Sequence, residues 1–295
     1  MKNHIILLLI FVVLMPIMAQ KKSIDVLKQD IQNKLTTLNG SFAVAFKDLK
    51  TGKTLFINEK ENFHAASTMK TPVMIEIFKQ AKAGKFAIND SIPLKNSFKS
   101  IVDGSPFSLD SADDSADSIY QKMGQKMMIY DLTYQMIIHS SNLATNVLID
   151  LVNAKNVNAS MRSFGAKDIQ ILRGVEDTKA FNAGLNNTVT AYDLMLIFEK
   201  IAKHKTVSKR ASKEMIKILT DQYFNSIIPS KLPKTVVVAH KTGSITGVQN
   251  DSGIVYLPDG HKYVVVFLSK NLTDVKAGVA VLADISEMLY NYVTF

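Results

Sequence analysis

Strand patterns occur only near the two ends of this 295-residue chain, and a long helical stretch separates them. The β-branched runs that indicate strands are 41–48, 54–58, 235–239, 253–257 and 263–269. The apolar stripes that indicate helices are 23–38, 68–83, 128–139, 143–152, 157–164, 190–204, 208–222 and 277–293. Because one domain buries its elements around a common core, the two groups of strands are expected to pair. The sequence therefore predicts an α/β fold of the α+β type, with a five-stranded antiparallel sheet flanked by helices and an all-helical lobe.

The sheet would be discontinuous in sequence. Its lobe is expected to contain residues 20–66 and 205–295, and the helical lobe residues 67–204, within one domain that spans 20–295. Part of the polar stretch 89–130 is expected to be a surface excursion. It is not expected to be a calcium loop, because its carboxylates lack the regular spacing of an EF-hand.

Residues 1–19 have the pattern of a secretory signal peptide. Lys2 supplies the positive start, an apolar run covers 5–15, and Ala19 offers a small residue for cleavage. Pro16 interrupts the run before it is long enough to span a bilayer, although an uncleaved anchor is the alternative. We expect a periplasmic or extracellular protein with no stable membrane insertion after signal cleavage.

Charge and composition exclude several classes of function. The chain has 35 Lys and Arg against 26 Asp and Glu, but the excess is scattered, so no nucleic-acid partner is expected. Cysteine is absent, which excludes disulfides and thiol nucleophiles. The six histidines lack a paired spacing, so neither a metal site nor a cofactor is predicted. A monomer is expected.

The segment Ser67-Thr68-Met69-Lys70 can supply an activated nucleophile. A spacing of three puts Ser67 and Lys70 on the same face of a helix. A partly buried lysine with a lowered pKa can take the serine proton, and an N–H at a helix N-terminus can stabilise an oxyanion. A helix cap beside a solvated cation is the alternative. Met69 is expected to pack in the core.

Two further polar segments could complete a site. Ser140-Ser141-Asn142 lies between two predicted helices, where a hydroxyl can pass a proton and an amide can bind a substrate amide; a polar helix cap is the alternative. Lys241-Thr242-Gly243-Ser244 follows the predicted strand 235–239. Its lysine and threonine could bind a carboxylate, Gly243 lets a ligand approach the backbone, and the Ser244 N–H could face an oxyanion. The alternative is a strand end in a polar turn.

Together and in this order, the three segments resemble the motif set of class A β-lactamases and penicillin-binding proteins. The resemblance extends over nearly the whole chain after residue 19. It implies that Ser67 is the acylated nucleophile, Lys70 its activating partner and Ser140 the proton shuttle to the leaving nitrogen. It also implies that the Ser67 and Ser244 N–H groups form the oxyanion hole.

The same resemblance implies the substrate contacts. Asn142 would bind the side-chain amide of the substrate. Lys241 and Thr242 would hold its carboxylate, with Gly243 at the point of closest approach. His64 and His240 flank the first and third motifs and are expected to be packed or capping residues.

A β-lactamase also hydrolyses its acyl-enzyme quickly, and class A enzymes use a glutamate that holds a water for this step. Glu176, with Asp177 beside it as a bystander, lies where the resemblance places that loop. Arg173 is one position further from Glu176 than the family pattern has it, and Ala180 stands where the family has an asparagine. A surface salt bridge between Arg173 and Glu176 is the alternative.

A further departure is Ser141, which stands where the family motif has an aspartate and removes a charge that buttresses this corner. The chain is nevertheless predicted to be an exported serine hydrolase that opens β-lactams through an acyl-serine. The alternatives are a D-Ala-D-Ala peptidase or esterase acting on peptidoglycan fragments, a slow-deacylating β-lactam binder, or a non-catalytic sensor that stays acylated.

Overall fold

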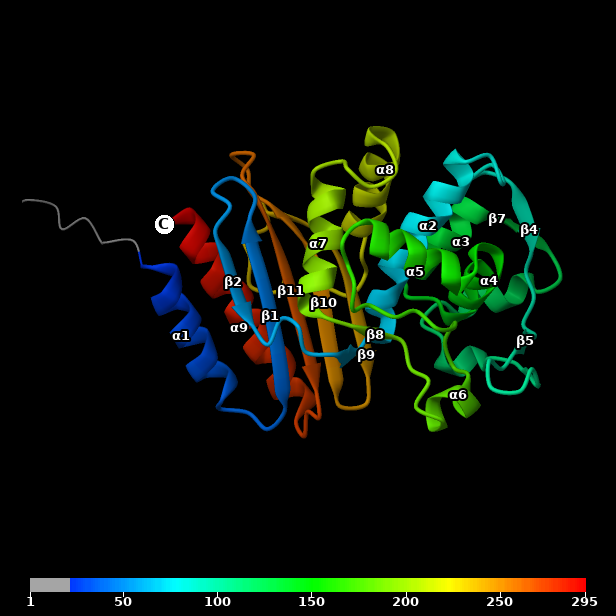
Figure 1. Ribbon diagram of the computed structural model, residues 1–295, viewed down its shortest axis with the longest axis horizontal. Helices are drawn as coiled ribbons and strands as arrows, with labels where there is room; N and C mark the ends of the chain where they lie inside the picture. Colours follow the sequence, from blue (N-terminus) through cyan, green and yellow to red (C-terminus); the bar gives the residue numbers. More distant parts are fainter. Residues whose placement is uncertain (1–21) are drawn as a thin grey trace, which may run out of the picture.

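The predicted α/β fold with one five-stranded antiparallel sheet is confirmed in a computed structural model that describes residues 22–295 (Figure 1). The sheet has the order β2-β1-β11-β10-β9. Its strands are β1 (Ser41–Asp48), β2 (Thr54–Ile57), β9 (Val237–Ile245), β10 (Val248–Tyr256) and β11 (Lys262–Lys270). The first strand therefore pairs with the last one, as the distribution of strand patterns implied. The predicted signal peptide lies outside the described residues.

Both faces of the sheet are buried, because alternate residues of the central strands enter two different cores. On β11, Val265 and Phe267 pack with α1 (Ile24–Leu35) and α9 (Val275–Thr294). Val264 and Val266 of the same strand belong to the larger core that the helical lobe shares. Figure 1 shows α1 and α9 on one side of the sheet and α7 (Ala191–Ala202) on the other.

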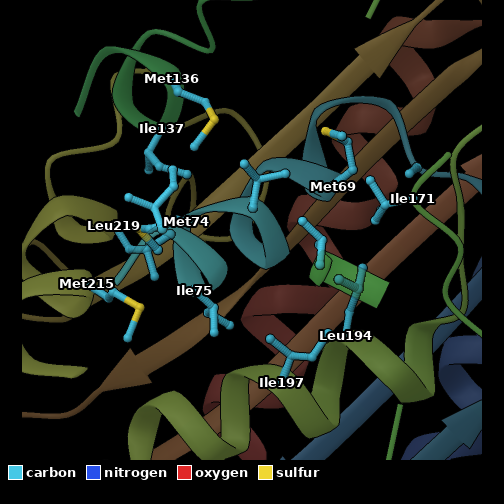
Figure 2. Packing of buried hydrophobic residues seen from close by; sticks show 14 of the residues in the cluster. Met69, Met74, Ile75, Met136, Ile137, Ile171, Leu194, Ile197, Met215 and Leu219 are labelled. Atoms are coloured by element: carbon cyan, nitrogen blue, oxygen red, sulfur yellow. The ribbon is translucent and has the colours of Figure 1, made fainter. Parts of the chain in front are cut away.

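Helix α2 (Lys70–Lys82) is the centre of the larger core, since all of its first nine residues are buried. Met69, immediately before it, is fully buried and points into the apolar cluster of Figure 2, which confirms its predicted packing role. The neighbouring helices are α3 (Ile129–Ile138), α4 (Asn142–Val152), α5 (Ala154–Ser163) and α8 (Lys209–Thr220). Helix α7 contacts β1, β10 and β11, so it lies on the sheet, whereas the sequence had suggested that it belongs to the helical lobe.

One segment differs from the sequence-based expectation. Strand β9 continues through residues 241–244 instead of ending before them, because these polar residues pair in register with β10 (Lys241 with Ser252, Gly243 with Asn250). Most residues of the stretch 89–130 are exposed, as expected for a surface excursion, while Leu94, Phe98 and Ile119 are buried.

Short elements connect the main ones. They are β3 (Phe63–His64), β4 (Ser91–Pro93), β5 (Phe98–Lys99), β6 (Pro106–Phe107), β7 (Lys126–Met128), β8 (Thr188–Val189), α6 (Thr178–Asn182) and the 3-10 turns η1 (Ala66–Met69), η2 (Ser111–Asp113) and η3 (Asp117–Lys122). Within residues 22–295, no helix is both long and apolar enough to cross a membrane.

Candidate active site

Ser67 and Lys70 lie where the 3-10 turn η1 passes into α2. Ser67 is partly exposed and lines a cleft, while Lys70 is the first residue of α2 and is fully buried. The Lys70 Nζ donates to the Ser140 carbonyl oxygen at 2.7 Å and to the Asn142 Oδ1 at 2.9 Å. Burial lowers the pKa of Lys70 to about 7, although the carboxylates of Asp114 and Glu176 oppose this shift. The fold therefore joins the first two motifs through the amine of Lys70.

Ser140 lies between two buried amines. Its Oγ is 3.2 Å from the Lys70 Nζ and 3.1 Å from the Lys241 Nζ. Its backbone adopts a left-handed conformation with φ 58°, which turns the chain sharply between α3 and α4. Burial lowers the pKa of Lys241 well below its usual value, and the charge of Lys70 lowers it further. The Ser140 hydroxyl therefore lies within hydrogen-bond distance of two amines whose mutual repulsion disfavours charging both at once.

Strand β9 forms the opposite wall of the cleft. Thr242, Gly243 and Ser244 all line it. A Cβ on Gly243 would lie 3.0 Å from the backbone nitrogens of Ser67 and Thr68, so only glycine lets this strand pack directly on η1. This close approach brings the backbone of Ser67 and of Ser244 to the same cleft.

Glu176 faces the first two motifs from the other side. Its Oε1 accepts a hydrogen bond of 2.5 Å from the Asn142 Nδ2, and its φ of 61° is left-handed. Burial raises the pKa of Glu176, and the hydrogen bond from Asn142 opposes that rise. The Arg173 guanidinium donates to the carbonyl oxygens of Gly174 and Leu185 and to Asn186 rather than to Glu176, so the salt-bridge alternative is wrong.

The loop that carries Glu176 is fixed by residues that the sequence analysis missed. The Asn146 side chain on α4 accepts from the Val175 N–H at 2.7 Å and donates to the Val175 carbonyl at 3.0 Å. A Cβ on Gly174 would lie 2.1 Å from the Asn146 Oδ1, so this contact requires glycine. Asn187 similarly accepts from the N–H groups of residues 172 and 173. An amide on the buried face of a predicted helix was the available signal for Asn146.

The residues that follow Glu176 do not supply its carboxylate with a second side-chain amide. Ala180 is buried, and Asn182 is exposed on α6. In the described part of the chain, Asn142 is the residue whose side-chain amide hydrogen-bonds Glu176. Asp177, predicted to be a bystander, caps α6 and accepts from the Ser100 hydroxyl and the Ile101 N–H.

The histidines beside the motifs are packed, as predicted. The Nδ1 of His64 accepts from the Ala66 N–H. His240 is fully buried, with one ring nitrogen 2.9 Å from the Asp251 carboxylate and the other 3.1 Å from Asn225.

The cleft between these walls has a volume of about 790 Å³. The cleft is lined by most of the predicted site residues: Ser67, Ser140, Asn142, Glu176, Thr242, Gly243 and Ser244. Lys70 and Lys241 are buried beneath it. Within residues 22–295, no group of three or more His, Asp or Glu side chains is arranged to hold a metal ion. The arrangement brings two serine hydroxyls, two buried lysine amines and a carboxylate together around one cleft.

Comparisons with known proteins match nearly the whole chain. A family model described as beta-lactamase enzyme family matches residues 26–293. The chain is similar to the beta-lactamase VEB-1 of Pseudomonas aeruginosa, with 24% identity over 97% of both sequences. The fold is similar to that of the TLA-1 extended-spectrum beta-lactamase, with a TM-score of 0.82, 21% identity, and coverage of 93% of this chain and 100% of that one. PBP-A has a TM-score of 0.77 at 25% identity, covering 90% of this chain and 95% of its own.

Proposed function

Because the chain belongs to the beta-lactamase enzyme family, we propose that it opens β-lactam rings through an acyl-serine on Ser67. The observation that carries this proposal is the position of Lys70, whose buried amine hydrogen-bonds Ser140 and Asn142 at the base of the cleft that Ser67 lines. An amine with a pKa of about 7 is half neutral at pH 7 and can therefore accept the serine proton.

Acylation then needs two proton transfers. The Ser67 Oγ attacks the lactam carbonyl while its proton passes to the Lys70 Nζ. The oxyanion accepts hydrogen bonds from the N–H groups of Ser67 and Ser244. As the carbon–nitrogen bond breaks, Ser140 donates its proton to the leaving nitrogen and regains one from an adjacent ammonium.

Substrate binding would use the same two walls. The substrate carboxylate would bind beside Thr242 and above the buried Lys241, and its negative charge would favour the ammonium form of that lysine. Asn142 would offer its amide to the acyl side chain. Because this amide already bridges Lys70 and Glu176, it also links the residues of the two chemical steps.

Deacylation is assigned to Glu176. Its carboxylate would take a proton from a water that attacks the acyl carbonyl. The bond from the acyl carbon to the Ser67 Oγ would then break, and this oxygen would take up the proton held by Glu176, which frees the acid product and restores the carboxylate. Desolvation raises the pKa of Glu176 and makes the carboxylate a stronger base.

A second candidate is a protein that acylates readily but hydrolyses the adduct slowly, or that acts as a D-Ala-D-Ala peptidase. It is favoured by Ala180, which leaves the water beside Glu176 without a second amide to orient it. The likeness to PBP-A supports it as well, since a variant of that protein has been crystallised as an acyl-enzyme with penicillin G.

One experiment separates these candidates. The purified protein is mixed with a chromogenic cephalosporin, and both product release and intact mass are followed. Continuous turnover supports the β-lactamase, whereas one product equivalent with a lasting mass increase supports the slow binder. Cleavage of a D-Ala-D-Ala peptide without reaction on the cephalosporin supports the peptidase.

Two variants assign the residues. We expect Ser67→Ala to abolish the mass increase, because this change removes the hydroxyl that is proposed to attack the lactam. Glu176→Gln should still gain the adduct but retain it, because the base for hydrolysis is lost. A Glu176→Gln variant that turns over like the parent would show that another group activates the water.

We also propose that residues 1–19 direct export and that the mature protein is a periplasmic or extracellular monomer. Edman sequencing of the protein recovered outside the cytoplasm should begin at Gln20. An N-terminus at Met1 would contradict cleavage, and a sedimentation coefficient of a dimer would contradict the monomer.

A further inference from the structure

The corner between α3 and α4 contains a serine where the resembled motif has an aspartate. Ser141 is fully buried, and its Oγ caps α4 by accepting from the Ala144 N–H at 3.2 Å. The Ser141 hydroxyl accepts from this single N–H and carries no charge. Several N–H groups at the start of a helix need partners. The corner therefore needs another acceptor.

That acceptor comes from a distant segment. The Asp114 carboxylate is 6% exposed and reaches the corner from the stretch between η2 and η3. Its Oδ2 accepts from the backbone nitrogens of Asn142 and Leu143, both at 2.9 Å, and from the Ser141 Oγ at 3.2 Å. The remaining donors to Asp114 are Tyr120 OH at 3.2 Å and Ala116 N–H at 3.0 Å.

These contacts place a negative charge at the N-terminus of α4, where the helix dipole favours it. Within residues 22–295, no lysine or arginine forms an ion pair with Asp114. Its hydrogen bonds therefore come from N–H and O–H donors of the corner and of its own segment. A buried carboxylate with these hydrogen bonds holds the backbone of the corner in place.

We propose that Asp114 is a positioning residue that replaces the missing carboxylate of position 141 and holds the corner 140–142 against Lys70. The proposal rests on the function proposed above for this cleft. All three hydrogen bonds that the Lys70 amine donates go to Ser140 and Asn142, so they depend on where this corner lies. Asp114 itself acts through these residues and does not touch the substrate.

The charge of Asp114 has a second consequence. Burial lowers the pKa of Lys70, and the carboxylates of Asp114 and Glu176 partly restore it. Lys241, from β9, contacts the same Ser140 Oγ as Lys70, and the charge of Lys70 lowers the pKa of Lys241. Loss of the charge at 114 should therefore move the titration of Lys70 to lower pH, which loss of packing alone would not do.

The test is a double-mutant cycle of Asp114→Asn, Ser141→Asp and the two together, with Asp117→Asn as the control. Asp117 is an exposed carboxylate of the same segment, so its change alters the net charge equally. Acylation by a chromogenic cephalosporin is measured in stopped flow from pH 5 to 9, and the melting temperature of each variant is recorded.

We expect Asp114→Asn to slow acylation by about tenfold to a hundredfold and to shift its pH midpoint downward. Ser141→Asp alone should also lower activity and melting temperature, because it buries a second carboxylate beside the first. The double variant should recover most of both losses, since one carboxylate again caps α4. Asp117→Asn should stay within about twofold of the parent.

Additive losses in the double variant, or an unchanged pH midpoint in a folded Asp114→Asn variant, would overturn the proposal. Reactivity of the parent protein is measured first, so failure of the proposed function is seen separately. If the parent does not react with β-lactams, the melting-temperature cycle still decides whether the carboxylate at 114 substitutes for one at 141.

Discussion

The protonation state of Lys70 sets the pH dependence expected for acylation. With an ordinary lysine pKa of 10.5, about 0.03% of the amine would be neutral at pH 7. With its pKa lowered to about 7, about half is neutral, which is a gain of about a thousandfold in the reactive form. If Lys70 accepts the serine proton, kcat/KM for acylation should rise about tenfold per pH unit below 7 and level off above it.

The assay is the acylation rate with a chromogenic cephalosporin between pH 5 and 9, measured under single-turnover conditions. At pH 5 the rate should be about 1% of its plateau. In Glu176→Gln the rise should persist with a lower midpoint, because the Glu176 carboxylate raises the pKa of Lys70. Lys70→Arg should lose both the rate and the rise, since arginine stays charged. Lys85→Gln, an exposed change beyond α2, serves as the control.

A rate that is flat from pH 5.5 to 8 would refute this reasoning, because no group that titrates near 7 would then control the nucleophile. A midpoint above 9 would refute it as well, since Lys70 would behave as a solvated lysine. A rise that disappears in Glu176→Gln would transfer the role of base from Lys70 to Glu176.

Three further predictions concern packing and charge. Gly174→Ala should displace the Asn146 amide and weaken its two hydrogen bonds to Val175 by about 2 kcal/mol in total. Adduct hydrolysis should then slow more than acylation, which time-resolved mass spectrometry can measure. Gly243→Ala should push β9 away from the Ser67 nitrogen and reduce the acylation rate, with an unaltered rate as the contrary result. Burial opposes ionisation of Asp48, but hydrogen bonds from its neighbours prevail and lower its pKa from 3.8 to about 2. The ionised form therefore stabilises the fold above pH 4, and this contribution is lost as the pH falls through 2. Asp48→Asn should lower the free energy of unfolding by about 1 kcal/mol at pH 7 and by less near pH 2. Urea titrations at the two pH values measure the difference.

The fold was predictable because its signals are local. The strand patterns at both ends, the glycine-containing turn at Gly52 and the helical stripes each depend on neighbouring residues. The extension of β9 was missed because His240 and Lys241 are polar and buried, which single-residue strand preferences disfavour. Their burial is possible only because contacts from other strands and loops satisfy them, for example Asp251 for His240.

The candidate site was predictable to the extent that its residues lie in short motifs. Ser67 and Lys70 are adjacent on one turn, so spacing alone related them. Asp114 and Asn146 were missed because their partners, residues 141–143 and Val175 respectively, are 27 or more residues away along the chain. An aspartate in a serine-rich segment resembles any solvated loop residue until tertiary packing buries it.

The pairing of β1 with β11 has a consequence for the order in which the molecule acquires activity. Strand β9, which supplies one wall of the cleft, reaches β1 only through β10 and β11, so the wall has no fixed position until the last strands have emerged and paired. Pairing between strands that are far apart in the sequence slows folding. During synthesis Ser67 would therefore exist for some time without the opposite wall of its cleft, and truncation before residue 270 should leave a polypeptide that cannot be acylated.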